Sequence, residues 1–220
     1  MPPDFEAARR NMVDSQVRPN RVSDSRVLGA MRRLPRERFL PTTLADRAYI
    51  DEDIALGGGR ALIEPMVIAR LVQLARPLEG ERGLVIGAGT GYGAAVLDAC
   101  GVHVTALEED RALLAIARPV LAAQAPDVTI VEGPLTAGLT DTGAWDIIII
   151  EGAIAAIPQT IAAQVKRPGG RLTTVICPRP GAPGQIVLAE PSGAGLRAQP
   201  AFDAGTPMLP AFERPAGFVF

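Results

Sequence analysis

The chain has 220 residues, a formal net charge of −2 at pH 7 and an apolar fraction of 48%. This length and composition suit one well-buried α/β domain, and 23 Gly with 20 Pro residues are too few to indicate disorder. Two cysteines and one histidine form neither a disulfide framework nor a metal-ligand set, and no apolar run reaches the length of a membrane span. We therefore expect a cytoplasmic protein that holds no metal and binds neither nucleic acid nor membrane.

Residues 1–78 are expected to form a helical extension on the substrate side of the domain. Amphipathic spacing predicts helices over Phe5–Val17 and Asp24–Leu34. A loop-rich passage from Phe39 to Gly59 follows. A further helix is predicted over Pro65–Ala75, because proline suits the first turn of a helix.

Residues 79–180 alternate between strand and helix patterns, which predicts a doubly wound, mostly parallel sheet. Ile147–Ile150 is apolar without alternation, as expected of a central parallel strand covered on both faces. The predicted elements are Leu84–Ile86, Tyr92–Cys100, His103–Leu107, Arg111–Gln124, Val128–Val131, Trp145–Ile150, Pro158–Val165 and Arg171–Ile176. Residues 181–220 are expected to add antiparallel edge strands at Gln185–Ala189 and Gly217–Phe220, with hairpin turns at Gly181–Gly184 and Ser192–Gly195.

A glycine-rich turn, Gly87-Ala88-Gly89-Thr90-Gly91, joins the first strand of this core to its helix. Glycines let the backbone turn tightly and approach a ligand closely. Glu108 ends the next strand seventeen residues after Gly91, where a carboxylate accepts both hydroxyls of a ribose. The spacing differs from that of dinucleotide folds, and no lysine follows as in a phosphate-binding loop. The pattern thus favours adenosine without pyrophosphate, and we expect S-adenosylmethionine in a Rossmann-type class I methyltransferase.

Several segments together resemble the protein-L-isoaspartate O-methyltransferase family, which methylates the carboxylate of isoaspartyl residues in damaged proteins. These are Arg38-Phe39-Leu40-Pro41, Ala48-Tyr49-Ile50-Asp51, Gly57-Gly58-Gly59 with Pro65, Gly87-Ala88-Gly89-Thr90-Gly91-Tyr92, Glu108, Trp145-Asp146, Ile157-Pro158 and Gly169-Gly170-Arg171-Leu172. The resemblance implies protein repair, with an isoaspartyl-containing protein or peptide as substrate. We expect a monomer or a homodimer. The expected cofactor-binding residues are Gly87, Ala88, Gly89, Thr90, Gly91, Tyr92, Glu108 and Gly133.

The glycine-rich loop over the substrate pocket departs from the family pattern, which reads roughly G-x-G-Q-T-I-S-Q-P. Ile63 stands at the family's serine position, so we do not expect it to be catalytic, and Glu64 stands at a glutamine position. Near an isoaspartyl carboxylate, Glu64 would cause like-charge repulsion that Arg60 would offset. The alternative is that Glu64 points to solvent at a helix N-terminus, where an acid is favourable.

Three departures surround the expected cofactor. Val85 stands where the family has an acid, and Pro134 where it has an aspartate thought to hold the adenine amino group. Losing one such hydrogen bond costs ~0.5–1.5 kcal/mol, so cofactor binding should weaken without vanishing. Glu151 replaces a small or hydroxylated residue and is a candidate general base or a contact to the cofactor ammonium. Tyr92 either walls the cofactor or packs on the N-terminal helices.

Isoaspartyl methylation is the leading hypothesis, and two alternatives stay open at this point. One is a methyltransferase for a different acceptor, in which Glu151 or Glu64 takes part. The other is a catalytically silent binding or adaptor protein that retains the fold, motivated by Ile63, Val85 and Pro134 together.

Overall fold

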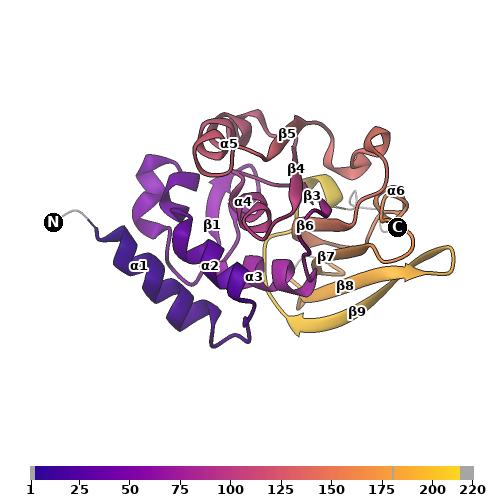
Figure 1. Ribbon diagram of the computed structural model, residues 1–220, viewed down its shortest axis with the longest axis horizontal. Coiled ribbons are helices and arrows are strands. Elements are labelled where there is room, and N and C mark those ends of the chain that lie inside the picture. The colour runs from indigo at the N-terminus through magenta and orange to yellow at the C-terminus, as the bar shows by residue number, and fades with distance from the viewer. Residues whose placement is uncertain (1–2, 180, 214–220) are drawn as a thin grey trace, which may run out of the picture.

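The computed structural model describes residues 3–179 and 181–213. A seven-stranded sheet in the order β5-β4-β3-β6-β7-β8-β9 forms its centre, and β1 and β2 form a separate hairpin (Figure 1). The elements are α1 Phe5–Met12, α2 Ser25–Arg33, β1 Ile54–Gly57, β2 Arg60–Leu62, α3 Pro65–Leu74, β3 Arg82–Ile86, α4 Tyr92–Asp98, β4 His103–Glu108, α5 Arg111–Gln124, β5 Thr129–Glu132, β6 Ile147–Ile154, α6 Gln159–Ala162, β7 Arg171–Ile176, β8 Gln185–Ser192 and β9 Gly195–Asp203.

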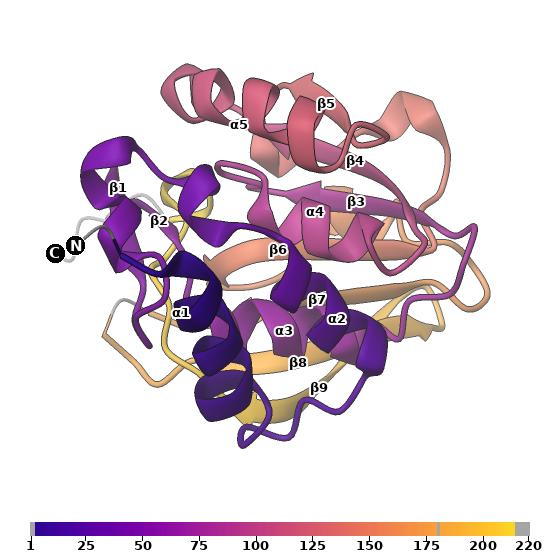
Figure 2. The ribbon, with the colours of Figure 1, turned by 60° about the vertical axis from the view of Figure 1, so that its left-hand side comes forward.

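The first five strands of this order are parallel, and β8 and β9 are antiparallel additions. Helices α3 and α4 lie on one face of the sheet, with α1 and α2 outside them (Figure 2). The apolar side chains of this face form one core with those of the N-terminal helices, and a second core around Trp145 and Ile161 fills the other face. This is the doubly wound arrangement that the alternating pattern predicts.

Most predicted elements are confirmed. Helix α5 and strand β7 have the predicted bounds, and α2 begins after Asp24, whose side chain accepts a hydrogen bond from the Arg26 N–H. The first predicted helix continues from α1 into a π-helical turn, Val13–Val17. No helix within residues 3–179 and 181–213 has the length and apolarity needed to cross a bilayer.

The C-terminal strands differ from the prediction. Gln185–Ala189 is wrong as an edge strand, because β8 runs on to Ser192 and pairs with β9, which is the outermost strand on this side among the described residues. The sequence Gly195–Asp203 was missed since its side chains are mostly exposed and show no apolar alternation. The predicted strand at Gly217–Phe220 lies outside the described residues.

The passage predicted as a loop from Phe39 to Gly59 is more ordered than expected. It holds a 3-10 helix over Thr42–Arg47 and the whole of β1. Strand β1 pairs antiparallel with β2 through a turn of three glycines, all with positive φ. Short apolar runs on both sides of these glycines are the hairpin signal that the loop interpretation passed over.

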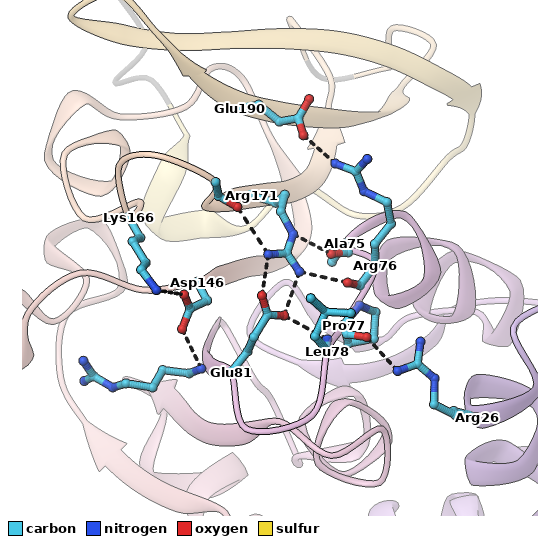
Figure 3. Close-up of polar contacts among 12 residues, drawn as sticks. Arg26, Ala75, Arg76, Pro77, Leu78, Glu81, Asp146, Lys166, Arg171 and Glu190 are labelled. Atoms are coloured by element: carbon cyan, nitrogen blue, oxygen red, sulfur yellow. Dashed lines mark hydrogen bonds and ion pairs between the residues drawn. The ribbon is translucent and has the colours of Figure 1, made fainter.

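At the amino ends of the strands, Arg171 ties β7 to the segment that precedes β3. Its guanidinium donates to both carboxylate oxygens of Glu81 at 2.7 Å, and to the carbonyls of Ala75 and Arg76 at 2.8 and 2.9 Å (Figure 3). These carbonyls follow the end of α3. The network therefore fixes α3 against the sheet at the edge opposite the glycine turn.

Candidate functional site

The glycine turn leaves the carboxyl end of β3 and enters α4. Gly87, Gly89 and Gly91 have φ values of 72°, 58° and 96°, a region that favours glycine. At Gly91 the need is also steric, since a Cβ there would lie 2.6 Å from a methyl carbon of Leu121. The turn is held to β4 because the N–H groups of Gly87 and Ala88 donate to the carbonyl of Leu107 at 3.0 and 3.2 Å.

Glu108 is the last residue of β4, beside this turn. Its side chain is 1% exposed, and its carboxylate accepts the N–H of Gly89 at 2.7 Å. The N–H groups of Glu109 and Asp110 donate to it at 2.9 Å each. The predicted glycine turn and acid are therefore brought together at the carboxyl edge of the sheet, where such folds bind ligands.

Arg60, the first residue of β2, lies on this acid. Its two terminal nitrogens donate to the two carboxylate oxygens of Glu108 at 2.7 and 2.8 Å, and one of them also to the carbonyl of Gly87 at 3.1 Å. Both side chains are buried. The predicted role of Arg60, to offset the charge of Glu64, is replaced by an ion pair with Glu108, the acid predicted to bind the ribose.

A C-terminal segment also covers the site. Leu209 donates its N–H to the carbonyl of Ala153 at 2.9 Å, and its buried side chain lies over two glycines. A Cβ would approach its methyl groups to 3.2 Å at Gly87 and its Cγ to 2.6 Å at Gly152. Sequence reasoning missed this cover, because Leu209 carries no local signal that places it against β3 and β6.

The residues present fit the adenosine half of S-adenosylmethionine. Glu108 has two carboxylate oxygens that match the two hydroxyls of a ribose, although Arg60 occupies both of them here. The space beside Gly89 has no heavy atom closer than 4.0 Å to a Cβ built there. In the same turn, the buried hydroxyl of Thr90 has no hydrogen-bond partner within the described part of the chain. Arg60 and Leu209 both approach Gly87, at the start of this turn.

Tyr92 lies beside the turn but faces away from it. Its ring is fully buried, meets Phe39 edge-on at 5.3 Å, and lies 4.8 Å from the guanidinium carbon of Arg36. The structure thus shows packing on the N-terminal part, one of the two roles predicted for Tyr92. A contact between Tyr92 and the cofactor stays a prediction. Gly133 follows β5, and its N–H donates to the Glu108 carbonyl at 3.1 Å.

Ile63 is buried beside the hairpin, 3% exposed. Its carbonyl accepts a hydrogen bond of 2.8 Å from Arg36, whose second contact is the Ala48 carbonyl at 2.8 Å. Arg36 is fully buried, and this burial lowers its pKa. Sequence reasoning missed Arg36, because both of its hydrogen-bond partners are backbone carbonyls that no motif marks.

Glu64 caps the start of α3 and is half-buried. Its N–H donates to Asp53 at 2.8 Å, and its carboxyl faces that residue and Asp51. Burial first, and then the charges of Asp53 and Asp51, raise the pKa of Glu64 to about 7. The predicted place at a helix N-terminus is confirmed, but the carboxyl carries only part of a charge at neutral pH.

Glu151 follows the last residue of β6 that pairs with β3. It is 8% exposed, and its carboxylate fills the space over Gly93, where a Cβ would lie 2.4 Å from one oxygen. Burial raises the pKa of Glu151 to about 8, against the opposing charges of Arg36 and Arg60. Its other oxygen has no hydrogen-bond partner among the residues described. This carboxyl is therefore mostly neutral at pH 7.

The structure also locates the two remaining departures from the family pattern. Val85 is buried within β3, and Pro134 is an exposed residue before a 3-10 helix.

The described residues offer no sign of a metal site. Cys100 and Cys177 are free thiols. Among residues 3–179 and 181–213, no group of three His, Cys, Asp or Glu side chains has the geometry of a metal site.

Comparisons with known proteins point to one methyltransferase family. The family described as protein-L-isoaspartate(D-aspartate) O-methyltransferase matches residues 7–184. A protein-L-isoaspartate O-methyltransferase of Methylorubrum extorquens is 39% identical over 186 residues, 84% of this chain and 80% of that protein. One from Methanoregula boonei is 35% identical over 190 residues, 86% of each chain.

Solved structures show the same fold. One protein-L-isoaspartate O-methyltransferase superposes with a TM-score of 0.76 at 23% identity, over 91% of this chain and 65% of that one. Another, from Plasmodium falciparum in complex with S-adenosyl-L-homocysteine, gives 0.74 at 16% identity, over 92% and 98%.

The family match and the sheet order make this chain a class I S-adenosylmethionine-dependent methyltransferase, and the glycine turn and the acid at the end of β4 are in keeping with that class. Within this class, the chain belongs to the protein-L-isoaspartate(D-aspartate) O-methyltransferase family. Its function is methylation of isoaspartyl residues with S-adenosylmethionine as the cofactor. This finding argues against the alternative of a catalytically silent adaptor protein.

Proposed function

We propose that Glu108 and the glycine turn hold S-adenosylmethionine, and that the methyl group goes to an isoaspartyl carboxylate on a protein or peptide. The observation that carries this assignment is the position of Glu108, hydrogen-bonded to Gly89 at the carboxyl edge of the sheet. Ala88, Thr90, Gly91 and Gly133 line the same edge. When bound, the cofactor supplies a methyl group on a sulfonium.

The chemistry needs little from the chain besides placement. An isoaspartyl carboxylate is ionised at neutral pH and attacks without a general base. The chain's part is to align the acceptor and to exclude water. Because the pKa of Glu151 is raised to about 8, its carboxyl is mostly protonated at neutral pH and is poorly placed to act as a base. This favours a carboxylate acceptor over a hydroxyl or an amine.

The acceptor is proposed to lie beside the β1–β2 hairpin, near Ile63 and Glu64. A half-ionised Glu64 repels an incoming carboxylate less than a full charge would, and its protonated form donates a hydrogen bond. Ile63 contributes apolar surface and no catalytic group. A partly protonated Glu64 is therefore compatible with a carboxylate acceptor at this place.

We further propose one domain of three parts, 1–78, 79–180 and 181–220, in a cytoplasmic monomer or homodimer without nucleic-acid or membrane partners. A net charge of −2 does not favour binding to the negatively charged surface of a nucleic acid or a membrane. Two buried free cysteines suit a reducing compartment.

The test is methyl transfer from labelled S-adenosylmethionine to a pair of peptides that differ only in one isoaspartyl or aspartyl linkage. Transfer to the isoaspartyl peptide, with little to its isomer, is the expected result. A peptide with asparagine at that position is the matched blank. Equal transfer to both isomers, or none at saturating cofactor, would overturn the proposed acceptor.

A further inference from the structure

Arg60 takes up the hydrogen-bonding capacity of Glu108. A carboxylate has about four lone-pair sites. Glu108 already accepts the N–H groups of Gly89, Glu109 and Asp110, at 2.7, 2.9 and 2.9 Å. The two bonds from Arg60, at 2.7 and 2.8 Å, bring the number of donors on this carboxylate to five, which more than fills these sites. No acceptor site is left for the two hydroxyls of a ribose while Arg60 stays in place.

The guanidinium also matches a ribose in form. It presents two parallel N–H donors to the two oxygens of one carboxylate, as vicinal hydroxyls do. Arg60 adds a contact of 3.1 Å to the carbonyl of Gly87, the first residue of the glycine turn. Arginine and ribose are therefore competitors for the same atoms.

The hairpin that carries Arg60 also meets the C-terminal segment of the chain. At its tip, a Cβ at Gly59 would lie 2.8 Å from the ring of Pro210, in the segment that also places Leu209 over Gly87. Its three glycines, Gly57, Gly58 and Gly59, all have positive φ, a backbone region that glycine adopts at little cost. Because β1 and β2 form a sheet of their own, a shift of β2 away from Glu108 breaks no hydrogen bond of the seven-stranded sheet, although it also moves the buried side chain of Leu62.

We propose that Arg60 is an internal competitor of the cofactor: S-adenosylmethionine binds by exchanging its ribose for the Arg60 guanidinium on Glu108, and this exchange releases the β1–β2 hairpin. The inference rests on the proposed function, because it takes Glu108 as the ribose-binding acid. After the exchange, the three backbone N–H groups still satisfy the carboxylate, so the acid keeps its orientation.

Calorimetric titration with S-adenosylhomocysteine tests the competition. Arg60→Gln removes the competitor and leaves the backbone donors, so this variant should bind about tenfold more tightly than wild type, or better. Arg76→Gln is the matched control, since Arg76 forms an exposed ion pair with Glu190, away from the glycine turn. The affinity of Arg76→Gln for S-adenosylhomocysteine should equal that of wild type. Equal or weaker binding by Arg60→Gln would overturn the proposal.

Two further measurements keep the result decisive. Arg60→Lys retains the charge and loses the paired donors, so its affinity for S-adenosylhomocysteine should lie between that of wild type and that of Arg60→Gln. If Arg60→Gln unfolds, Arg60→Lys takes its place in the comparison with wild type. Amide exchange in residues 54–62 of wild type should increase when S-adenosylhomocysteine is added. Unchanged or slower exchange would contradict release of the hairpin.

The outcomes separate this inference from the proposed function. If wild type and Arg60→Gln bind with the same affinity, the cofactor site stands and the competition is overturned. If neither binds while both are folded, the cofactor site itself is wrong and the competition falls with it. Binding by Arg60→Gln alone supports both.

Discussion

The buried guanidinium of Arg36 donates a hydrogen bond of 2.8 Å to the carbonyl of Ile63, directly after the β1–β2 hairpin. Another bond of 2.8 Å reaches the carbonyl of Ala48, before the hairpin, and the guanidinium lies over the ring of Tyr92 at the start of α4. One side chain thus joins both ends of the hairpin to the helix that follows the glycine turn. We infer that Arg36 sets the position of the hairpin over the cofactor edge.

Arg36→Lys should destabilise the protein by ~1–3 kcal/mol, since a single ammonium replaces the planar fork and leaves a buried carbonyl unsatisfied. Urea unfolding measures the change. Arg38→Lys is the control, because Arg38 is exposed and belongs, like Arg36, to a 3-10 helix over Arg36–Phe39. Equal midpoints for Arg36→Lys and wild type would show that Arg36 does not hold these segments.

Glu151 predicts a pH dependence of stability. Burial raises the pKa of Glu151 from 4.5 to about 8, so the folded state keeps a proton that the unfolded state releases. Stability is full below pH 4.5 and is lost as the pH rises through about 8. Relative to Glu151→Gln, the free energy of unfolding of wild type should fall by about 1.4 kcal/mol per pH unit in this window. A constant difference between the two would mean that the folded carboxyl is ionised throughout.

Glu64 predicts a pH dependence of acceptor binding. Its pKa of about 7 means that the carboxyl gains charge between pH 6 and 8 and begins to repel an isoaspartyl carboxylate. The KM for an isoaspartyl peptide should rise roughly threefold to tenfold over this range in wild type. Glu64→Gln should show a flat profile with similar kcat. A rise of the same size in Glu64→Gln would assign the effect to another group.

The Arg171–Glu81 pair predicts a loss of stability without a loss of cofactor binding. Although burial pushes the pKa of Glu81 upward, hydrogen bonds from Arg171 and from the Leu78 N–H hold it below its usual value. Arg171→Gln should cost about 3 kcal/mol, because it leaves a largely buried carboxylate and two carbonyls unpaired (Figure 3).

Arg76→Gln, on an exposed ion pair nearby, should cost less than about 1 kcal/mol. Affinity for S-adenosylhomocysteine should be unchanged in folded Arg171→Gln, since the network lies at the opposite edge of the sheet. Weakened binding there would show that the two edges are coupled. Because the pKa of Glu81 is lowered, its contribution should disappear as the pH falls through that pKa.

The parts of the site that the sequence predicted are those encoded locally. The glycine turn and Glu108 belong to one strand-helix-strand unit, so their spacing is enough to place them together. The same holds for α5, whose capping residue Asp110 and apolar face give its bounds. The fold class follows from such units because parallel strands joined by helices pack in few ways.

The parts that the sequence did not predict join distant segments. Arg60 and Glu108 are 48 residues apart, and Arg36 and Ile63 are 27 apart. Leu209 reaches Gly87 from the far end of the chain. Nothing in the local pattern of these residues selects a partner, because an arginine finds its carboxylate or carbonyl only after the sheet and the hairpin have formed.

The most direct test of this account is calorimetric titration of wild type and Glu108→Ala with S-adenosylhomocysteine, with thermal unfolding to show that both are folded. The account predicts micromolar binding by wild type and a loss of at least about tenfold in the variant, because the ribose loses both of its acceptors. Binding of equal strength in Glu108→Ala, or no binding by folded wild type, would contradict the assignment of this edge of the sheet as the cofactor site.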